Sequence, residues 1–391
     1  MHFFVIMKHN WEYKKLGDLC DIVRGGSPRP IQDYLTSDKD GLNWIKIGDV
    51  SPGEKYIIST KEKIKKEGLK KTRAVYKGDF ILSNSMSFGR PYILKIDGCI
   101  HDGWLAIKNV ESHFIPDFLY YYLSSPSTYL LFVKLVRGGV VNNLNSDIVR
   151  GISVPVPPRE VQEQIVAELD TINEGITELK EQIKDFDNLG QTLFYETFGD
   201  PISNPKGWEV KKLLEVSPIS PSIQTPLAVN GKFWLLNLDQ IESQTGKIIE
   251  KQYFKLSDIG NSTTMFDEDN VLYSKLRPYL NKVVVPDSTG YGSSELLPFR
   301  PKKEVLSREY LARALRSNEF VEHINEKTGG AKMPRVKMEY LRNFLLPVPP
   351  LPLQKQFAEQ IEAIEKMKVE LEAQIADAQT LLDSRMDYWF N

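Results

Sequence analysis

Two glycine pairs, each surrounded by basic or amide side chains, are the positions in this sequence best suited to hold an anionic ligand. The first pair is Gly138-Gly139 and the second is Gly329-Gly330, at equivalent places in the two halves of the chain. Glycine lets the backbone come close to a ligand because it has no Cβ. Lysine and arginine contact phosphates, while arginine, amide and hydroxyl side chains also bond base edges. This pattern therefore predicts contacts to a nucleic acid.

The predicted DNA-contacting residues form one set in each half of the chain. The first set is Lys46, Lys63, Lys66, Lys70, Lys71, Arg73, Asn84, Ser85, Ser87, Arg90, Arg137, Gly138, Gly139, Asn142, Asn143 and Asn145. The second set is Asn237, Ser274, Lys275, Arg277, Tyr279, Lys327, Thr328, Gly329, Gly330, Lys332, Arg335 and Lys337. Two alternatives remain open. The basic run could be a solvated surface, because Glu62 and Glu67 interleave with its lysines, and the glycine pairs could be plain connecting loops.

Two long helices are predicted to follow two Pro-Pro pairs, Pro157-Pro158 and Pro349-Pro350, which lie 192 residues apart. Proline suits the start of a helix but not its interior. Apolar residues then recur in steps of three and four, as in a heptad seam. The first seam is Ile165, Leu169, Ile172, Ile176, Leu179, Ile183 and Phe186, and the second is Phe357, Ile361, Ile364, Leu371, Ile375 and Leu382. We expect these helices to pair with each other; the alternative is two amphipathic helices that each pack on their own domain.

Three seam positions carry residues that do not suit an apolar contact: Gly190, Lys368 and Arg385. They leave the register of the pairing open. A buried lysine is costly unless its ammonium reaches water or a carboxylate.

The lobes that precede the helices are also repeated. Residues 11–16 read WEYKKL and residues 208–213 read WEVKKL, a match in five of six positions. Further matches keep an offset of about 190 to 197 residues, which indicates one duplication of a lobe with its helix. The predicted fold is α+β, with two similar α/β lobes joined by two long helices in an antiparallel coiled coil with an internal pseudo-two-fold. The predicted segments are lobe 1–158, helix 159–198, lobe 199–350 and helix 351–391.

Two local expectations concern the first lobe. The alternation in residues 43–50 predicts one strand, and the basic residues 61–73 are expected to form a helix or a loop. The second lobe has no counterpart of similar composition to this basic segment. We therefore expect the two lobe surfaces to differ while the scaffold is kept.

Charge is distributed unevenly along the chain. The formal net charge is -2, but residues 160–197 alone carry ten acidic and two basic side chains. Residues 353–391 carry eight acidic and four basic side chains, which leaves about +10 for the rest. Acidic helices and basic lobes favour an anionic partner for the lobes. The helices are expected to stay off the phosphates because like charges repel.

Several classes of protein are disfavoured. The sequence has no phosphate-binding loop of the ATPase type, no dinucleotide-binding glycine motif and no nucleophile elbow. It also lacks the Asn/Asp-Pro-Pro-aromatic tetrapeptide of amino-methyltransferases. The two cysteines, Cys20 and Cys99, lie in no metal-ligand spacing, so no metal site is expected and a reducing cytoplasm is the default. No apolar run is long enough for a membrane span.

Taken in order, these features resemble the specificity subunit of type I restriction-modification systems. The resemblance rests on the Trp-Glu-x-x-Lys-Leu start, the glycine pair, the Pro-x-Pro-Pro junction with Gln162 and Gln164, or Gln354 and Gln356, and the heptad helix, all present twice. It covers the chain from Trp11 to its last residue.

The resemblance implies that each lobe is a target recognition domain that reads one half of a split, asymmetric double-stranded DNA site. It implies that the helices set the gap and dock two methyltransferase subunits, which use S-adenosylmethionine, and that restriction and translocase subunits join the complex. The chain itself would hold no cofactor and catalyse nothing. Two other readings are a coiled-coil adaptor whose lobes bind protein and the recognition part of a combined methyltransferase and endonuclease.

Overall fold

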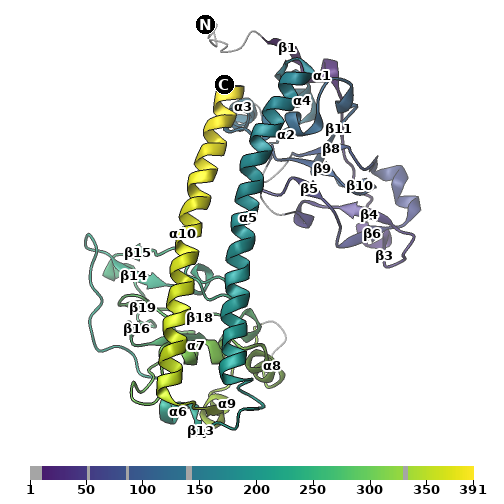
Figure 1. Cartoon of the computed structure of the whole chain (residues 1–391). Helices are drawn as coiled ribbons and strands as arrows, with labels where there is room; N and C mark the ends of the chain where they lie inside the picture. Colours follow the sequence, from purple (N-terminus) through teal and green to yellow (C-terminus); the bar gives the residue numbers. More distant parts are fainter. Residues whose placement is uncertain (1–10, 51–52, 85–87, 138–142, 329–332) are drawn as a thin grey trace. The chain divides into compact units, whose positions relative to one another are not determined.

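The computed structural model describes residues 11–50, 53–84, 88–137, 143–328 and 333–391. The chain divides into two compact units, Met1–Lys180 with Ala373–Asn391, and Glu181–Glu372. Each unit contains one lobe and a segment of each of two long helices (Figure 1). The units thus divide within the helices and not at their ends, so the lobe and helix boundaries given above remain a prediction.

The two long helices are α5 (Arg159–Phe198) and α10 (Leu351–Phe390), and each has 40 residues. Both begin directly after a Pro-Pro pair, where a helix does not need the amide N–H groups of its first turn. Their first and last residues are separated by the same offset of 192 residues. The two copies of the duplicated unit therefore have helices of equal length.

The lobe of the first unit is built from two five-stranded sheets and a short two-stranded one. Their strand orders are β2-β11-β8-β9-β5, β3-β6-β4-β10-β7 and β1-β12. The strands are β1 (Glu12–Lys15), β2 (Asp21–Arg24), β3 (Leu35–Thr36), β4 (Leu42–Ile45), β5 (Tyr56–Ile57), β6 (Glu62–Ile64), β7 (Arg73–Val75), β8 (Phe80–Ser83), β9 (Pro91–Leu94), β10 (Gly98–Ile100), β11 (Trp104–Lys108) and β12 (Ser153–Val156). The helices are α1 (Leu16–Leu19), α2 (Pro116–Ser124), α3 (Pro126–Arg137) and α4 (Ser146–Gly151).

The lobe of the second unit repeats this order with fewer strand pairs. Its sheets are β15-β14-β19-β16, β18-β17-β20 and β13-β21. The strands are β13 (Val210–Lys212), β14 (Phe233–Leu236), β15 (Tyr253–Phe254), β16 (Thr264–Phe266), β17 (Val271–Ser274), β18 (Val283–Val284), β19 (Gly290–Gly292), β20 (Leu296–Phe299) and β21 (Leu345–Pro347). The helices are α6 (Leu213–Val216), α7 (Arg308–Arg316), α8 (Asn318–Glu326) and α9 (Met338–Asn343). The prediction of two similar α/β lobes is confirmed.

Two local expectations were wrong. The strand expected over residues 43–50 ends at Ile45, and a 3-10 helix follows at Ile47–Asp49 because the Asp49 carboxylate accepts the Lys46 N–H at 2.8 Å. The basic segment is neither one helix nor one loop. It contains β6, a 3-10 helix at Lys66–Lys71 and β7.

A buried glutamine fixes each lobe to the helix that follows it. In the first unit, Gln162 accepts the Ile115 N–H at 2.8 Å and donates to the carbonyls of His113 and Pro157 at 3.2 and 3.0 Å. In the second unit, Gln354 makes the equivalent bonds to Ser307, Val305 and Pro349. All three partners are also offset by 192 residues. Each amide has its bonds satisfied, as burial requires.

The seam residues of the first unit pack antiparallel. Ile165, Leu169 and Ile176 of α5 share a hydrophobic core with Leu382, Met386 and Phe390 of α10, together with residues of the lobe. The two segments run in opposite directions (Figure 1). Each of these side chains contributes about 1.5–3 kcal/mol on burial.

The second unit repeats the arrangement with the other ends of the same helices. Phe186, Phe194 and Phe198 of α5 pack in one core with Phe357, Ile361 and Ile364 of α10. The ring centroids of Phe198 and Phe357 are 5.1 Å apart. The remaining seam residues follow the prediction less uniformly: Ile172, Leu179, Ile183 and Ile375 are partly buried, whereas Leu371 is buried.

The polar seam residues have partners that explain them. Lys368 Nζ lies 2.7 Å from the Asp187 carboxylate and 3.1 Å from that of Glu365. The Arg385 guanidinium pairs with Glu168 in the first unit, with one bond at 3.2 Å. At Gly190, a Cβ would lie 3.0 Å from Nη2 of Arg313, so glycine leaves room for that guanidinium. The three interruptions therefore support one register within each unit.

Ile176→Asp should destabilise the first unit by about 3 kcal/mol or more, because a carboxylate would replace a side chain that is only 2% exposed. Urea unfolding followed by far-UV circular dichroism measures the change. Leu381→Asp, at a half-exposed position of α10, is the matched control and should change stability by less than about 0.5 kcal/mol. Equal stability of the two variants would contradict the buried seam.

Candidate nucleic-acid interface

One backbone hydrogen bond, present in both lobes, joins the two segments of each predicted DNA-contacting set. In the first lobe the Leu144 N–H donates to the Asn84 carbonyl at 3.0 Å. In the second lobe the Val336 N–H donates to the Lys275 carbonyl at 2.9 Å. The bonded residues are offset by 191 and 192 residues, so they are structural equivalents. In each lobe the loop after β8 or β17 thus lies beside the segment that leads into α4 or α9.

In the second lobe this pairing gathers basic side chains from two distant parts of the chain. The Arg277 N–H donates to the Pro334 carbonyl at 2.8 Å, and a β-bridge joins Leu276 to Arg335. Arg277 has a φ of 49°, in the left-handed region, which turns the chain directly after the bridge. Tyr279, which is 45% exposed, follows it. The segment with Lys275, Arg277 and Tyr279 and the segment with Arg335 therefore share one surface.

The carboxylate of Glu295 lies within this basic group. The Arg335 guanidinium donates to it with Nε and Nη2, at 3.2 and 3.0 Å, and Lys275 Nζ lies 4.0 Å away. The hydrogen bonds that Arg335 donates to Glu295 raise the pKa of Arg335 above its ordinary value. A phosphate that bound here would have to replace this carboxylate. The equivalent position of the first lobe is Gly103, so the two lobes differ at this point.

Two predicted contact residues serve the fold instead. Asn84 is 3% exposed, and its Nδ2 donates to the Asp102 carbonyl at 2.9 Å. Ser274 is also 3% exposed, and its Oγ donates to the Leu276 carbonyl at 3.0 Å. Both side chains are enclosed and bonded to their own lobe, so neither is exposed to a duplex in this conformation.

The basic segment of the first lobe is anchored on one side and exposed on the other. Ile64, Gly68 and Thr72 are buried, four residues apart. Lys66 and Lys70, between these positions, and Arg73, directly after them, are exposed. This geometry suits a phosphate-binding surface and a solvated surface equally, so the alternative stated for this segment stays open.

Other predicted side chains have partners within the lobe but remain near its surface. Lys63 Nζ bonds the Lys39 carbonyl at 2.7 Å, Lys71 Nζ bonds the Tyr34 hydroxyl at 2.8 Å, and Lys46 Nζ pairs with Glu62 at 2.6 Å. Lys327 Nζ lies 2.6 Å from His323 Nε2. Burial and, to a smaller extent, Lys327 lower the pKa of His323. These lysines would exchange one bond for another on binding a phosphate.

The remaining predicted residues occupy loops or the starts of short helices. Asn145 caps α4 by accepting the Ile148 N–H at 2.9 Å, Thr328 donates to the Asn325 carbonyl at 2.9 Å, and Asn237 and Lys337 precede short helices. Arg90 and Asn143 are exposed. Ser85, Ser87, Gly138, Gly139, Asn142, Gly329, Gly330 and Lys332 lie outside the described residues, as does the side chain of Arg137.

Arg29 is a candidate that the sequence reasoning passed over. Its guanidinium is 81% exposed and lies 3.5 Å from the carboxylate of Asp102, whose carbonyl also holds Asn84. The hydrogen bond from Ser27, with help from the nearby charges, keeps the pKa of Asp102 below its ordinary value. The signal was available, because Arg29 follows a third glycine pair. That pair has a packing role: a Cβ at Gly25 would lie 2.1 Å from the His101 carbonyl oxygen.

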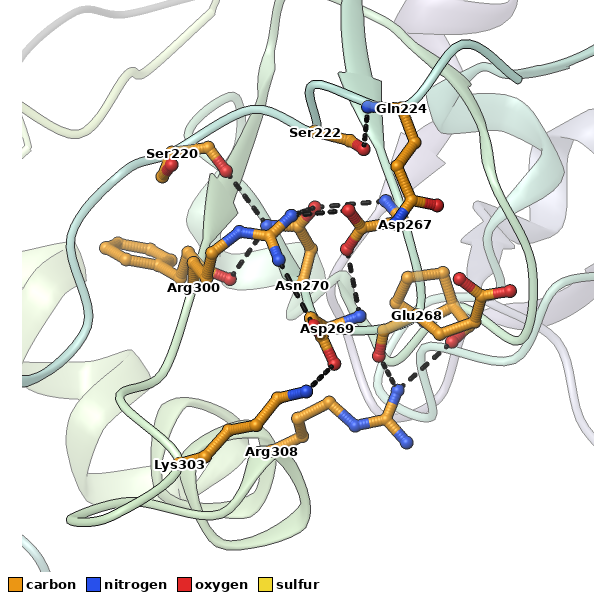
Figure 2. Close-up of polar contacts among 12 residues, drawn as sticks. Ser220, Ser222, Gln224, Asp267, Glu268, Asp269, Asn270, Arg300, Lys303 and Arg308 are labelled. Atoms are coloured by element: carbon orange, nitrogen blue, oxygen red, sulfur yellow. Dashed lines mark hydrogen bonds and ion pairs between the residues drawn. The ribbon is translucent and has the colours of Figure 1, made fainter.

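A group of carboxylates in the second lobe is neutralised by basic residues of the same lobe (Figure 2). Arg300 pairs with Asp267 at 2.5 Å and with Asp269 at 3.3 Å, and Lys303 pairs with Asp269 at 2.8 Å. Burial acts to raise the pKa of Asp267, but hydrogen bonds from Ser222 and Arg300 outweigh it and hold the pKa below 3.8. We interpret this group as a structural ion cluster that connects the turn between β16 and β17 to the end of β20.

Neither a metal site nor a membrane span is found in the part of the chain that the structure describes. No three His, Cys, Asp or Glu side chains among the described residues are grouped to hold a metal ion. None of the described helices is both long enough and apolar enough to cross a membrane.

Comparison with known proteins gives a family and a fold. The family model for the type I restriction modification DNA specificity domain matches twice, over residues 8–185 and 205–378. The EcoDI specificity subunit of Escherichia coli is 26% identical over 176 residues, which are 45% of this chain and 39% of that protein. The MjaIX specificity subunit of Methanocaldococcus jannaschii is 21% identical over 408 residues, covering 96% of this chain and 91% of that protein.

Two solved structures share the fold. One, from work on complex assembly and conformational transition of the type I restriction-modification system, has a TM-score of 0.55 and 20% identity over 97% of both chains. The other is the type I system S subunit from M. genitalium, with a TM-score of 0.51 and 11% identity over 99% of this chain and 98% of that one.

Arg335→Ala and Glu295→Gln should change binding to duplex DNA in opposite directions. The first removes a cation and should reduce the salt dependence of binding by about one phosphate contact. The second removes a competing carboxylate and should tighten binding. Fluorescence anisotropy over a series of salt concentrations measures both effects. Lys303→Ala is the control, because it removes a basic residue of the ion cluster that lies outside this surface. Weaker binding by Glu295→Gln would rule out competition by the carboxylate.

Proposed function

The chain belongs to the type I restriction modification DNA specificity domain family, and from this premise we propose that each lobe reads one half of a bipartite, asymmetric double-stranded DNA target. The observation that carries the proposal is the repeated bond between the loop after β8 or β17 and the segment before α4 or α9. It brings the same two segments of the lobe together twice in one chain. Two related surfaces with different side chains suit two different half-sites, as the two halves of a dimeric DNA-binding protein suit a symmetric one.

The two lobes differ where specificity would be set. The second lobe has Glu295 beside Arg335, where the first lobe has Gly103. The first lobe has the lysine-rich segment around Lys66 and Lys70, exposed above a buried row. Phosphate contacts position a protein on DNA, while base contacts specify the sequence. We infer that the shared scaffold sets the position of each lobe and that the divergent side chains select the half-site.

The long helices set the gap between the half-sites and bind the catalytic partners. Both are strongly acidic, so electrostatic repulsion keeps them from the DNA phosphates and leaves their surfaces for protein. The partners we propose are two methyltransferase subunits, which supply S-adenosylmethionine chemistry on adenine, with restriction and translocase subunits added to that core. In this proposal the chain itself catalyses nothing and holds no cofactor. A cytoplasmic location follows from cellular DNA as the proposed partner.

The test is to sequence DNA that has been methylated by the chain together with its methyltransferase. The expected result is a split motif with an unread gap of several base pairs. Replacing residues 199–350 with the corresponding lobe of a relative should change only one half of that motif. A continuous motif, or a change of both halves on exchanging one lobe, would contradict the proposal.

A further inference from the structure

A lysine of the first lobe joins its lobe to the helix α5, and the second unit lacks the equivalent contact. Lys55 Nζ lies 2.5 Å from Asp117 of α2 and 3.1 Å from Asp170 of α5. The Tyr121 hydroxyl bonds the same Asp170 oxygen at 2.5 Å. Burial acts to lower the pKa of Lys55, but the bonds to the two carboxylates outweigh it and raise the pKa. The side chain is only 11% exposed and fills the space between lobe and helix.

The second unit has each of these positions at the offset of 192 residues, but the lysine points elsewhere. Lys247 is the equivalent of Lys55, Glu309 of Asp117, and Glu362 of Asp170. Lys247 Nζ pairs with Glu372 of α10 instead. Glu372 lies ten residues beyond Glu362, which is about 15 Å along a helix.

The turn that carries Lys247 explains the different direction. The Gln244 N–H bonds the Leu280 carbonyl at 3.0 Å, and Gln244 Nε2 bonds the Tyr279 carbonyl at 3.0 Å. Gly246 has a φ of +69°, and a Cβ there would lie 1.8 Å from the Val283 carbonyl oxygen. Only glycine lets the turn lie this close to β18. The turn is therefore held against its own lobe, and Lys247 leaves it toward Glu372.

A cavity of about 1290 Å³ lies in the second unit, lined by α7, α10, the end of α5 and the turn with Lys247. Eight of the lining side chains are acidic and six are basic. The basic residues are largely occupied: Lys368 by Asp187 and Glu365, Arg313 by Glu365 at 3.6 Å, and Arg316 by the Val283 carbonyl. Glu309 lies 3.5 Å from its neighbour Arg308, which bonds the carbonyls of Glu268 and Pro286 (Figure 2). Glu362 is exposed.

We propose that this cavity receives a lysine or arginine side chain from the methyltransferase partner, which pairs with Glu309 and Glu362 as Lys55 pairs with Asp117 and Asp170 in the first unit. The inference rests on the proposed function, because it names a docking contact of that complex. The chain itself supplies the reason for the occupant: the equivalent space in the first unit holds a basic side chain between the equivalent carboxylates. Ala312 and Ala358, which also line the cavity, suit the aliphatic stem of such a side chain.

The two units would then bind their methyltransferase subunits unequally. In the first unit the site is filled by the chain's own lysine, so a partner gains no ion pair there. In the second unit the partner completes the pair. Loss of a carboxylate from an enclosed interfacial ion pair weakens binding substantially.

The test measures the affinity of the full chain for the methyltransferase by titration calorimetry, with Glu309→Gln combined with Glu362→Gln. The binding step at the second unit, which is the tighter of the two, should weaken by about tenfold or more, while the other step is unchanged. Glu370→Gln, an exposed position of α10 outside the cavity, is the matched control and should bind as the wild type. The Tm of the double variant should match that of the wild type. In the wild type, Glu309 and Glu362 are not joined by a lysine in the way that Lys55 joins Asp117 and Asp170.

A second variant tests the cavity without changing charge. Ala358→Trp should block it and weaken the same binding step. If both variants bind two methyltransferase subunits as the wild type does, the cavity is not a docking site and the proposal is wrong. If inorganic phosphate raises the Tm of the chain and Arg316→Lys removes the effect, while partner binding is unchanged, the cavity is an anion site and the proposal is equally wrong. A wild-type chain that binds no methyltransferase would instead overturn the proposed function together with this inference.

Discussion

The packing of α5 against α10 in opposite directions is the constraint on which the rest of each unit depends. Each helix has 40 residues, too many for one lobe to cover, so its narrow apolar stripe needs the other helix. In both units the apolar stripe packs in one core with the lobe. Phe390 belongs to that core in the first unit, and Phe357 in the second. A lobe, its buried glutamine and the paired helix segments are therefore one cooperative structure.

Duplication preserves this structure, while the polar residues around it diverge. Gln162 and Gln354 form hydrogen bonds with equivalent residues of their lobes, because any change there would leave a buried amide unsatisfied. The ion pairs on the seam are not repeated: Glu168 with Arg385 and Asp187 with Lys368 are not related by the offset. Such pairs favour one register over its alternatives. The differences at Glu295 and at Lys247 lie outside the strands and helices.

The sequence was informative where periodicity or repetition applied, and less so elsewhere. The heptad steps and the Pro-Pro pairs indicated both helices, because backbone and burial follow directly from spacing. The strand expected over residues 43–50 failed because a single side-chain bond, from Lys46 N–H to Asp49, ends it at Ile45. Asn84 and Ser274 have residue types suited to DNA contacts, but burial cannot be inferred from type. The loop pairing at Asn84 and Lys275 joins segments about 60 residues apart, which local patterns do not encode.

Disulfide trapping of the helix register tests the account most directly. Cysteines at Asp187 and Lys368, whose side chains meet in the second unit, should form an intramolecular disulfide in mild oxidant, whereas cysteines at Asp187 and Gln379 should not. The native Cys20 and Cys99 are buried, and burial raises the pKa of each to about 11, so they react slowly. We predict an efficient disulfide between positions 187 and 368 and none between positions 187 and 379. Trapping of 187 with 379, which is its equivalent in a parallel pairing, would contradict the antiparallel arrangement.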